Sequence, residues 1–173
     1  VGLYVDDFCF FSESDAVKQA FRDKLAASYK VSYEESLEWF LGMAFHWKDD
    51  NGALQCHVHQ EAFIQDLVHR HKLSDCNKSP RATPFRSGFP VDTIPPSTLS
   101  ESEQFPVTKL YQQLIGDLTW ISISTRPDLC AIVSLLAEHQ ARPSKQHLDA
   151  ARYVVRYLAS TPSHGLFFAH KSN

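Results

Sequence analysis

The stretch WFLGMAFHWKDDNGALQCHVH, residues 39–59, decides the fold of this chain. Large apolar residues occupy every odd position from Trp39 to Trp47, which is the period of a strand with one buried face. Asp50-Asn51-Gly52 then offers residues that tolerate positive φ, as a tight hairpin turn requires. The return alternates in the same way, with apolar side chains at Leu54, Cys56 and Val58. This pattern predicts a β-hairpin with a first strand over 39–47.

The residues before this hairpin predict a second, shorter one. Two β-prone runs in residues 2–11 flank Asp6 and Asp7, which indicates a strand, a tight turn with the acids at its tip, and a strand. Ser12 and Asp15 have the spacing of a capping box, and an apolar stripe follows on one helix face. We therefore expect a helix over 15–28.

The residues after the hairpin predict helices and one long interruption. An apolar stripe favours a helix over 60–72, formed by Phe63, Ile64, Leu67, Val68 and His71. Six of the nine prolines lie between Pro80 and Pro106, so neither a helix nor a strand is expected there. Three helical stripes follow, around 110–121, 129–136 and 148–158.

The predicted ends of these later helices have recognisable capping residues. Thr125 lies before Pro127 as an N-cap does, Ser144 suits the start of the last helix, and Thr161-Pro162 suits its end. Leu166-Phe167-Phe168 predicts the beginning of a strand.

Composition and charge exclude several protein classes. The chain has 43% hydrophobic and 21% charged residues and a formal net charge of −3, a balance typical of globular proteins rather than disordered ones. Residues 1–50 contain five Lys/Arg and ten Asp/Glu, whereas the remainder has 12 and 10, so the acidic residues are concentrated early.

No apolar run is long enough to predict a membrane helix. The four scattered cysteines fit a reducing compartment better than a disulfide framework.

The adjacent acids Asp6 and Asp7 are the strongest chemical signal. Neighbouring carboxylates repel each other unless a cation lies between them or water solvates both. Mg²⁺ prefers carboxylate oxygens and keeps water positions that substrate phosphates can take. The pair therefore predicts either a divalent-metal site or a solvated turn.

Several motifs, in order along nearly the whole chain, resemble those of copia-type LTR retrotransposon reverse transcriptases. Tyr4-Val5-Asp6-Asp7 matches the YxDD box, and Trp39-Phe40-Leu41-Gly42 is similar to the primer-grip segment. Further matches are Gln60 to Ile64, Thr83-Pro84, Tyr111 to Gly116, Thr125 to Asp128, and a closing pattern through Pro143, His147, Ala150, Arg152, Arg156, Tyr157, Leu158, Thr161 and Gly165.

The resemblance implies the second half of an RNA-directed DNA polymerase. Asp6 and Asp7 would be the catalytic acids that bind two Mg²⁺ ions, Asp6 more directly. Primer contacts would come from Tyr4, Val5, Trp39, Phe40, Leu41 and Gly42. The partners would be an RNA or DNA template with a DNA primer and, in the complete enzyme, deoxynucleoside triphosphates. The resemblance implies localisation in the cytoplasm, in a virus-like particle or in the nucleus, and no membrane partner.

The resemblance also implies an α+β fold in four parts. Residues 1–78 would be the later part of an incomplete polymerase palm, 79–106 a Pro-rich linker, 107–165 a helical thumb-like bundle, and 166–173 the start of a following strand. The upstream polymerase half, with a third metal-binding aspartate, is absent, so this chain alone is expected to be inactive. Lys30 is a weak match to the family's general acid. Phosphate contacts would come from Arg126, Arg152 and Arg156.

Two alternatives stay open at this stage. The chain could be a non-catalytic nucleic-acid-binding or interaction domain that has decayed from a transposon. A zinc site can also be drawn from residues between 56 and 76, although no C-x-x-C pair supports it and such spacings give many false positives. Its candidate ligands are Cys56, His57, His59, His69, His71 and Cys76.

Overall fold

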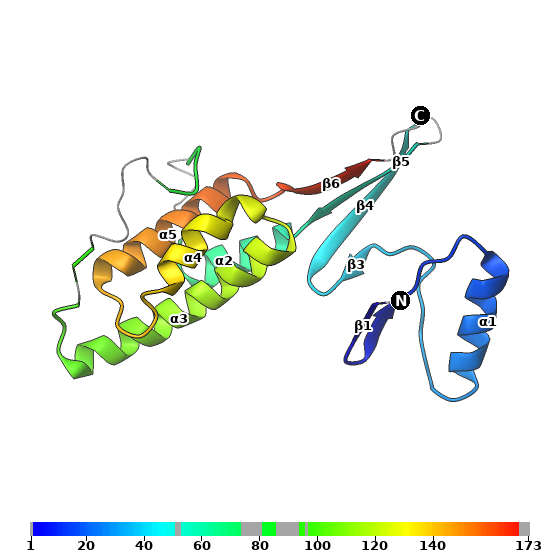
Figure 1. Cartoon of the computed structure of the whole chain (residues 1–173), viewed down its shortest axis with the longest axis horizontal. Coiled ribbons are helices and arrows are strands. Elements are labelled where there is room, and N and C mark those ends of the chain that lie inside the picture. Colours follow the sequence, from blue (N-terminus) through cyan, green and yellow to red (C-terminus); the bar gives the residue numbers. More distant parts are fainter. Residues whose placement is uncertain (1, 51–52, 74–80, 86–93, 96, 170–173) are drawn as a thin grey trace.

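The structure is a computed structural model that describes residues 2–50, 53–73, 81–85, 94–95 and 97–169. It combines helices with two antiparallel sheets, which confirms the α+β expectation at that level. Figure 1 shows a bundle of helices at one end, a twisted sheet in the middle, and a small hairpin with one helix at the other end. In the part of the chain that is described, no helix is long and apolar enough to cross a membrane.

The early hairpin and helix form as expected, with one difference at the helix cap. Strands β1 (Gly2–Tyr4) and β2 (Asp7–Cys9) pair antiparallel, and α1 spans Asp15–Ala26. The expectation that Ser12 caps α1 is wrong. Ser14 is the N-cap, and its side chain accepts a hydrogen bond from the Val17 amide at 3.4 Å. Ser12 instead accepts one from the Ser14 amide at 3.2 Å.

The larger sheet contains the predicted long hairpin. Its strand order is β3-β4-β5-β6, with β3 (Trp39–Phe40), β4 (Met43–Asp50), β5 (Ala53–His59) and β6 (Gly165–Ala169). Asp50 pairs with Ala53, which confirms the hairpin, while its turn residues Asn51 and Gly52 lie outside the described residues. Strand β6, predicted from Leu166 to Phe168, pairs with β5.

The expected single strand over 39–47 is wrong, because a turn divides it. Leu41 and Gly42 adopt φ values of 51° and 75°, and this left-handed pair reverses the chain between β3 and β4. Trp39 therefore pairs with Ala44, and Trp39 is 51% exposed rather than part of a buried face.

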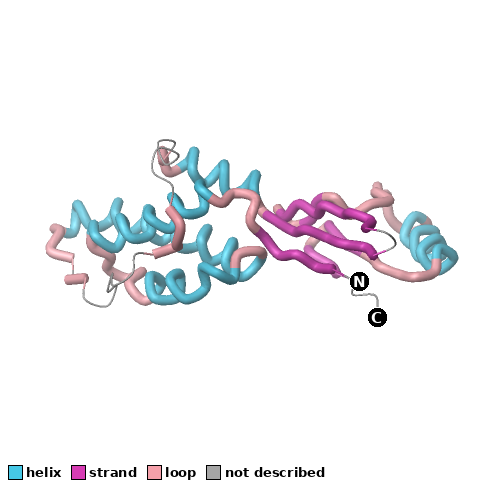
Figure 2. Tube along the Cα trace, turned by 90° about the horizontal axis from the view of Figure 1, so that it is seen from above, coloured by secondary structure: helices cyan, strands magenta, loops and turns pink. Residues whose placement is uncertain are grey.

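The helices form one bundle around a shared core. Helix α2 (Glu61–Arg70) is followed by α3 (Glu101–Ser124), the 3₁₀ helix η3 (Pro127–Leu129), α4 (Cys130–Ala137) and α5 (Lys145–Ser160). Figure 2 shows these helices together, beyond the end of the sheet. Each contributes buried side chains to one cluster, among them Ile64 of α2, Leu118 of α3, Leu129 of η3, Leu136 of α4 and Val155 of α5.

Two expectations about helix ends need correction. Helix α3 begins at Glu101 and contains Pro106, although no helix was expected before the last proline of the 80–106 run. A capping box between Ser100 and Glu103 starts this helix, and Pro106, its sixth residue, lacks the amide that would donate to the Ser102 carbonyl oxygen. Much of the Pro-rich run lies outside the described residues. The expectation that Thr125 is the N-cap before Pro127 is wrong. Thr125 is the C-cap of α3, and Arg126 is the N-cap before Pro127.

Gly165 provides a test of how closely β6 approaches β5. A Cβ atom at this position would collide with the carbonyl oxygen of Val58 and lie 2.9 Å from the His59 Cβ. We expect Gly165→Ala to lower the free energy of unfolding by about 1–3 kcal/mol, because backbone cannot yield as a flexible side chain does. Urea unfolding measures the change.

A matched control is Gly116→Ala, because a Cβ at Gly116 meets nothing within 4 Å. Since Gly116 lies in helix α3, this change should raise stability by about 0.5–1 kcal/mol. Equal effects of the two substitutions would contradict the close approach of β6 to β5.

Candidate active site

The acidic pair lies at a strained two-residue turn. Tyr4 pairs with Asp7, so Val5 and Asp6 form the turn between β1 and β2. Val5 has a φ of 49°, a left-handed value that β-branched residues rarely adopt and that costs about 1–3 kcal/mol. Asp6 lies in the turn itself, whereas Asp7 is the first residue of β2 rather than part of the tip. Both aspartates are exposed to solvent.

Aromatic contacts hold this hairpin against α1. The Phe21 ring stacks on Phe10, with centroids 4.5 Å apart, and meets the edge of Phe8 at 5.9 Å. Yet no side chain described between residues 2 and 49 is buried. The acids are therefore displayed on a small unit that has no enclosed core of its own.

The residues expected to contact a primer are found in two tight turns. Tyr4, the last residue of β1, is 58% exposed, and Val5, the first residue of the acidic turn, is 78% exposed. Leu41 and Gly42 form the β3–β4 turn, and the two residues of β3, Trp39 and Phe40, lead into it. Lys30 is exposed in the loop that follows α1.

The three arginines expected to bind phosphate lie in different environments. Arg126 is only 1% exposed, and its guanidinium forms a bidentate ion pair with Asp128. Nε donates to Oδ1 at 3.0 Å and Nη2 donates to Oδ2 at 2.8 Å. Arg126 also donates to the Thr161 carbonyl oxygen at 2.9 Å, so it does not lie on an exposed positive face. Burial opposes ionisation of Asp128, but hydrogen bonds from Arg126 and Tyr157 hold its pKa below the ordinary value.

Helix α5 contains Arg152 and Arg156, and Arg81 packs against the same helix. Arg152 and Arg156 are half-buried, and Arg152 lies 3.6 Å from the carboxylate of Asp149. Arg81 lies over the Tyr153 ring at 5.0 Å, and its backbone amide donates to Ser160 Oγ at 3.0 Å. Sequence reasoning missed Arg81 because only the folded chain brings it to α5.

The zinc hypothesis finds no support in the described residues. None of them form a group of three or more His, Cys, Asp or Glu side chains that could hold a metal ion, and Cys76 lies outside them. His59 instead stacks on His46, with ring centroids 4.8 Å apart, and tilts against His57 at 5.1 Å. His71 lies 3.9 Å from Asp117.

Two buried histidines make stability depend on pH. Burial and the neighbouring His46 and His57 lower the pKa of His59, against a smaller opposite effect of Glu61. Burial and His139 lower the pKa of His147. The unfolded chain, with histidine pKa values near 6.5, therefore takes up protons first, and stability should fall as pH drops through 6.5.

Urea unfolding at pH 8.5, 7.5 and 5.5 checks this expectation. The midpoint should be equal at the two higher values and lower at pH 5.5. Replacing both His59 and His147 by glutamine should reduce the drop, and an unchanged drop would assign the acid sensitivity to other groups.

Comparisons with known proteins identify the chain's relatives. It is 30% identical over 165 residues to the "Retrovirus-related Pol polyprotein from transposon RE2" of Arabidopsis thaliana, covering 95% of this chain. The corresponding RE1 polyprotein of the same plant is 27% identical over 165 residues, also covering 95% of this chain. The chain spans about a tenth of the length of each, since the matches cover 10% of both polyproteins.

A shorter relative is the "Putative transposon Ty5-1 protein YCL074W" of Saccharomyces cerevisiae, 28% identical over 94% of this chain and 49% of its own length. No family model matches the chain. No solved structure matches it. The homologues of this chain thus include copia-type retrotransposon Pol polyproteins.

Proposed function

We propose that this chain is a segment of a reverse transcriptase, an RNA-directed DNA polymerase, and that its β1–β2 hairpin supplies metal-binding acids. One observation carries the proposal: Asp6 and Asp7 are exposed side by side at a strained turn. Backbone strain at a surface turn is typical of functional sites, where geometry matters more than local stability. The alignment with Pol polyproteins over 95% of the chain supports this assignment.

The donor chemistry of the pair fits Mg²⁺ in part. Carboxylate oxygens are the ligands that Mg²⁺ prefers, and Asp6 would bind it more directly than Asp7. Two carboxylates leave coordination positions to fill, and the described residues offer no cluster of three. The remaining protein ligand would therefore come from another part of a polymerase. When bound, the metal ions would activate a primer 3′-hydroxyl and stabilise charge on a triphosphate.

Other residues of the chain would position the nucleic acid. Tyr4 and Val5 present exposed side chains beside the acids, next to the expected primer end. The β3–β4 turn at Leu41 and Gly42, together with Trp39 and Phe40, would hold the primer strand. Lys30, exposed after α1, is the candidate proton donor to the leaving pyrophosphate.

A primer-extension assay tests the function. The isolated chain should extend no oligo-dT primer on poly-rA with Mg²⁺, because two acids cannot hold both metals and the nucleotide. A fusion that places the preceding segment of the RE2 polyprotein before Gly2 should extend it. An inactive fusion that still binds template-primer would favour the non-catalytic alternative.

The α5 arginines predict a measurable salt dependence. Each phosphate that they neutralise releases condensed counterions, so replacing Arg152 and Arg156 together by alanine should reduce the log-log salt slope of template-primer binding by roughly 1–2 units. Filter binding of the fusion between 50 and 300 mM KCl measures the slope. Lys109→Ala, an exposed cation of α3, is the control and should leave it unchanged. An unaltered slope in the double variant would place both arginines outside the interface.

A further inference from the structure

The larger sheet has two faces of different chemistry. Residues that pair directly across antiparallel strands have their side chains on the same side of the sheet. Phe45 pairs with Val58 and Trp47 with Cys56, so these apolar side chains share one face. They line a hollow of about 650 Å³. The residues that alternate with them along β4 and β5 form the second face.

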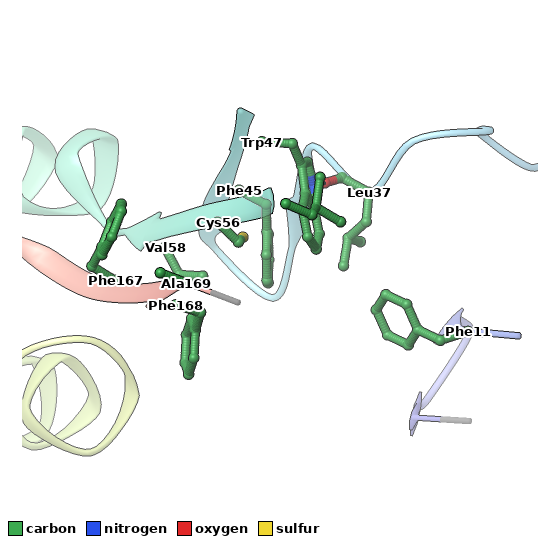
Figure 3. A pocket seen from close by; sticks show the side chains of 10 residues that line it. Phe11, Leu37, Phe45, Trp47, Cys56, Val58, Phe167, Phe168 and Ala169 are labelled. Atoms are coloured by element: carbon green, nitrogen blue, oxygen red, sulfur yellow. The ribbon is translucent and has the colours of Figure 1, made fainter. Parts of the chain in front are cut away.

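A row of aromatic rings crosses the second face. His46 of β4 pairs with His57 of β5, and His57 pairs in turn with Phe167 of β6. Figure 3 shows Phe167 and its neighbour Phe168 on opposite sides of β6, although Phe167 also borders the hollow at the sheet edge. Three neighbouring strands therefore each contribute one ring to a single row.

Two more aromatic residues lie on the same side of the sheet. Trp39 pairs with Ala44, and Ala44 pairs with His59, so both rings lie on the side that contains His46. Trp39 is also one of the residues expected to contact a primer. We name this side the histidine face, formed by Trp39, His46, His57, His59 and Phe167.

The rings of the histidine face are open to water and yet held in place. Phe167 is 63% exposed, Trp39 is 51% exposed, and His46 is exposed as well. The His46 ring stacks on the buried His59 ring, with centroids 4.8 Å apart and an interplanar angle of 11°. His57 tilts against His59 at 5.1 Å. Because these contacts already orient the rings, a flat ligand can stack on them with little further loss of conformational entropy.

The charge of the histidine face suits an anionic partner. Lys48 is exposed on the same side of β4 and pairs with the neutral Gln55. The acid in this register, Asp50, is the last residue of β4, at the turn of the hairpin. The Asp6–Asp7 hairpin leads to the other face, since Phe11, which follows it, lines the hollow. The histidine face therefore combines flat rings with a cation.

Flat rings beside a cation are the chemistry that recognises unpaired nucleobases. Every base offers a π-face to an aromatic side chain, and the cation neutralises the adjacent phosphate. Neighbouring strands lie about 4.8 Å apart, so the row of three rings spans roughly 10 Å, and other sheets with aromatic rings on one face stack two or three bases. We propose that the histidine face binds single-stranded nucleic acid by stacking its bases on His46, His57 and Phe167.

This binding goes beyond the proposed polymerase function. It requires no metal ion and neither of the acids Asp6 and Asp7, because the register and exposure of the rings carry it. A duplex would bind more weakly, since its bases already stack on one another and their π-faces are not free for the protein.

Fluorescence anisotropy of the chain with a labelled 15-mer of oligo-dT tests this surface. His46→Ala and Phe167→Ala should each weaken binding at least about fivefold, because each removes one stacking ring. Phe168→Ala, which changes a 55% exposed ring on the other side of the same strand, is the matched control and should alter binding less than about twofold. Circular dichroism shows whether each variant is folded.

Two further oligonucleotides separate base stacking from attraction of charge. An abasic 15-mer keeps the phosphates but has no bases, and it should bind at least about tenfold more weakly than oligo-dT. The duplex of oligo-dT with oligo-dA should also bind more weakly. Equal binding of the abasic strand would show attraction of charge alone and overturn the proposal. Equal effects of Phe167→Ala and Phe168→Ala, or tighter binding of the duplex, would overturn it too.

An NMR titration of the unaltered chain covers the case in which a variant does not fold. Addition of oligo-dT should shift the imidazole Cε1–H resonances of His46 and His57 and leave the ring resonances of Phe168 in place. Unshifted histidine resonances at millimolar oligo-dT would contradict the proposal. Binding of the strand by a chain whose fusion extends no primer would contradict only the proposed polymerase function.

Discussion

Replacing Asp6 by asparagine should reduce primer extension by the fused enzyme by on the order of a thousandfold or more. The substitution keeps the size of the side chain but removes the negative charge that would bind Mg²⁺ and, through it, stabilise the transferring phosphate. The loss should appear mainly in kcat, because the primer strand contacts other residues. Single-turnover extension with a saturating template-primer measures it.

Three controls separate this effect from damage to the hairpin. Asp15→Asn changes a neighbouring exposed acid that pairs with Lys18 at 2.9 Å in α1, and extension should stay within about twofold of the parent enzyme. Asp7→Asn should be less harmful than Asp6→Asn if Asp7 supports the metal indirectly. Bound Mn²⁺ broadens the NMR resonances of residues near its site, and this broadening should be lost for Asp6→Asn. A fully active Asp6→Asn enzyme would remove Asp6 from the site.

The sequence predicted those elements whose signal lies within a few residues. Alternation along 53–59 and the Asp50-Asn51-Gly52 turn motif predicted the long hairpin, and the register from Ala44 to Asp50 confirms it. The capping role of Ser144 is confirmed, although its reciprocal partner is His147 rather than an acid. In these cases the stabilising contacts are local, so the pattern carries them.

The division of the 39–47 strand was hidden by the same alternation. Trp39 pairs with Ala44, so the two-residue turn at Leu41 and Gly42 puts Trp39 on the opposite face from Phe45, although apolar residues continue at odd positions through the turn. Only a glycine at position 42, where φ is positive, distinguishes this turn from a continuous strand. The sequence therefore predicted the correct residue types for β3 and β4 but one strand too few.

The candidate site shows the same limit for charged residues. The sequence placed Asp6 and Asp7 in a hairpin because apolar runs flank them on both sides. It could not distinguish Arg126, which is buried, from Arg152 and Arg156, which are half-buried, since the residues that enclose Arg126 are distant in the chain. Tyr157 and Thr161, which complete its environment, come from α5 and its C-cap.

Arg126→Ala is expected to cause the largest loss of stability, about 3–5 kcal/mol. The guanidinium is almost fully enclosed, and it joins Asp128 of η3 to Thr161 at the end of α5. Its removal would leave the Asp128 carboxylate without its cation, the Thr161 carbonyl oxygen without this donor, and a cavity beside Tyr157. Urea unfolding at pH 7.5 should show a lower midpoint with an unchanged slope.

Conservative and exposed substitutions show whether geometry or charge is responsible. Arg126→Lys keeps the charge but cannot form two parallel bonds to Asp128 and also reach Thr161, so it should recover less than half of the loss. Arg156→Ala removes a half-buried arginine of α5 and should cost below about 1 kcal/mol. If Arg126→Lys were as stable as the parent chain, charge alone would suffice. If Arg126→Ala were tolerated, the link between η3 and α5 would not stabilise the helix that presents Arg152 and Arg156.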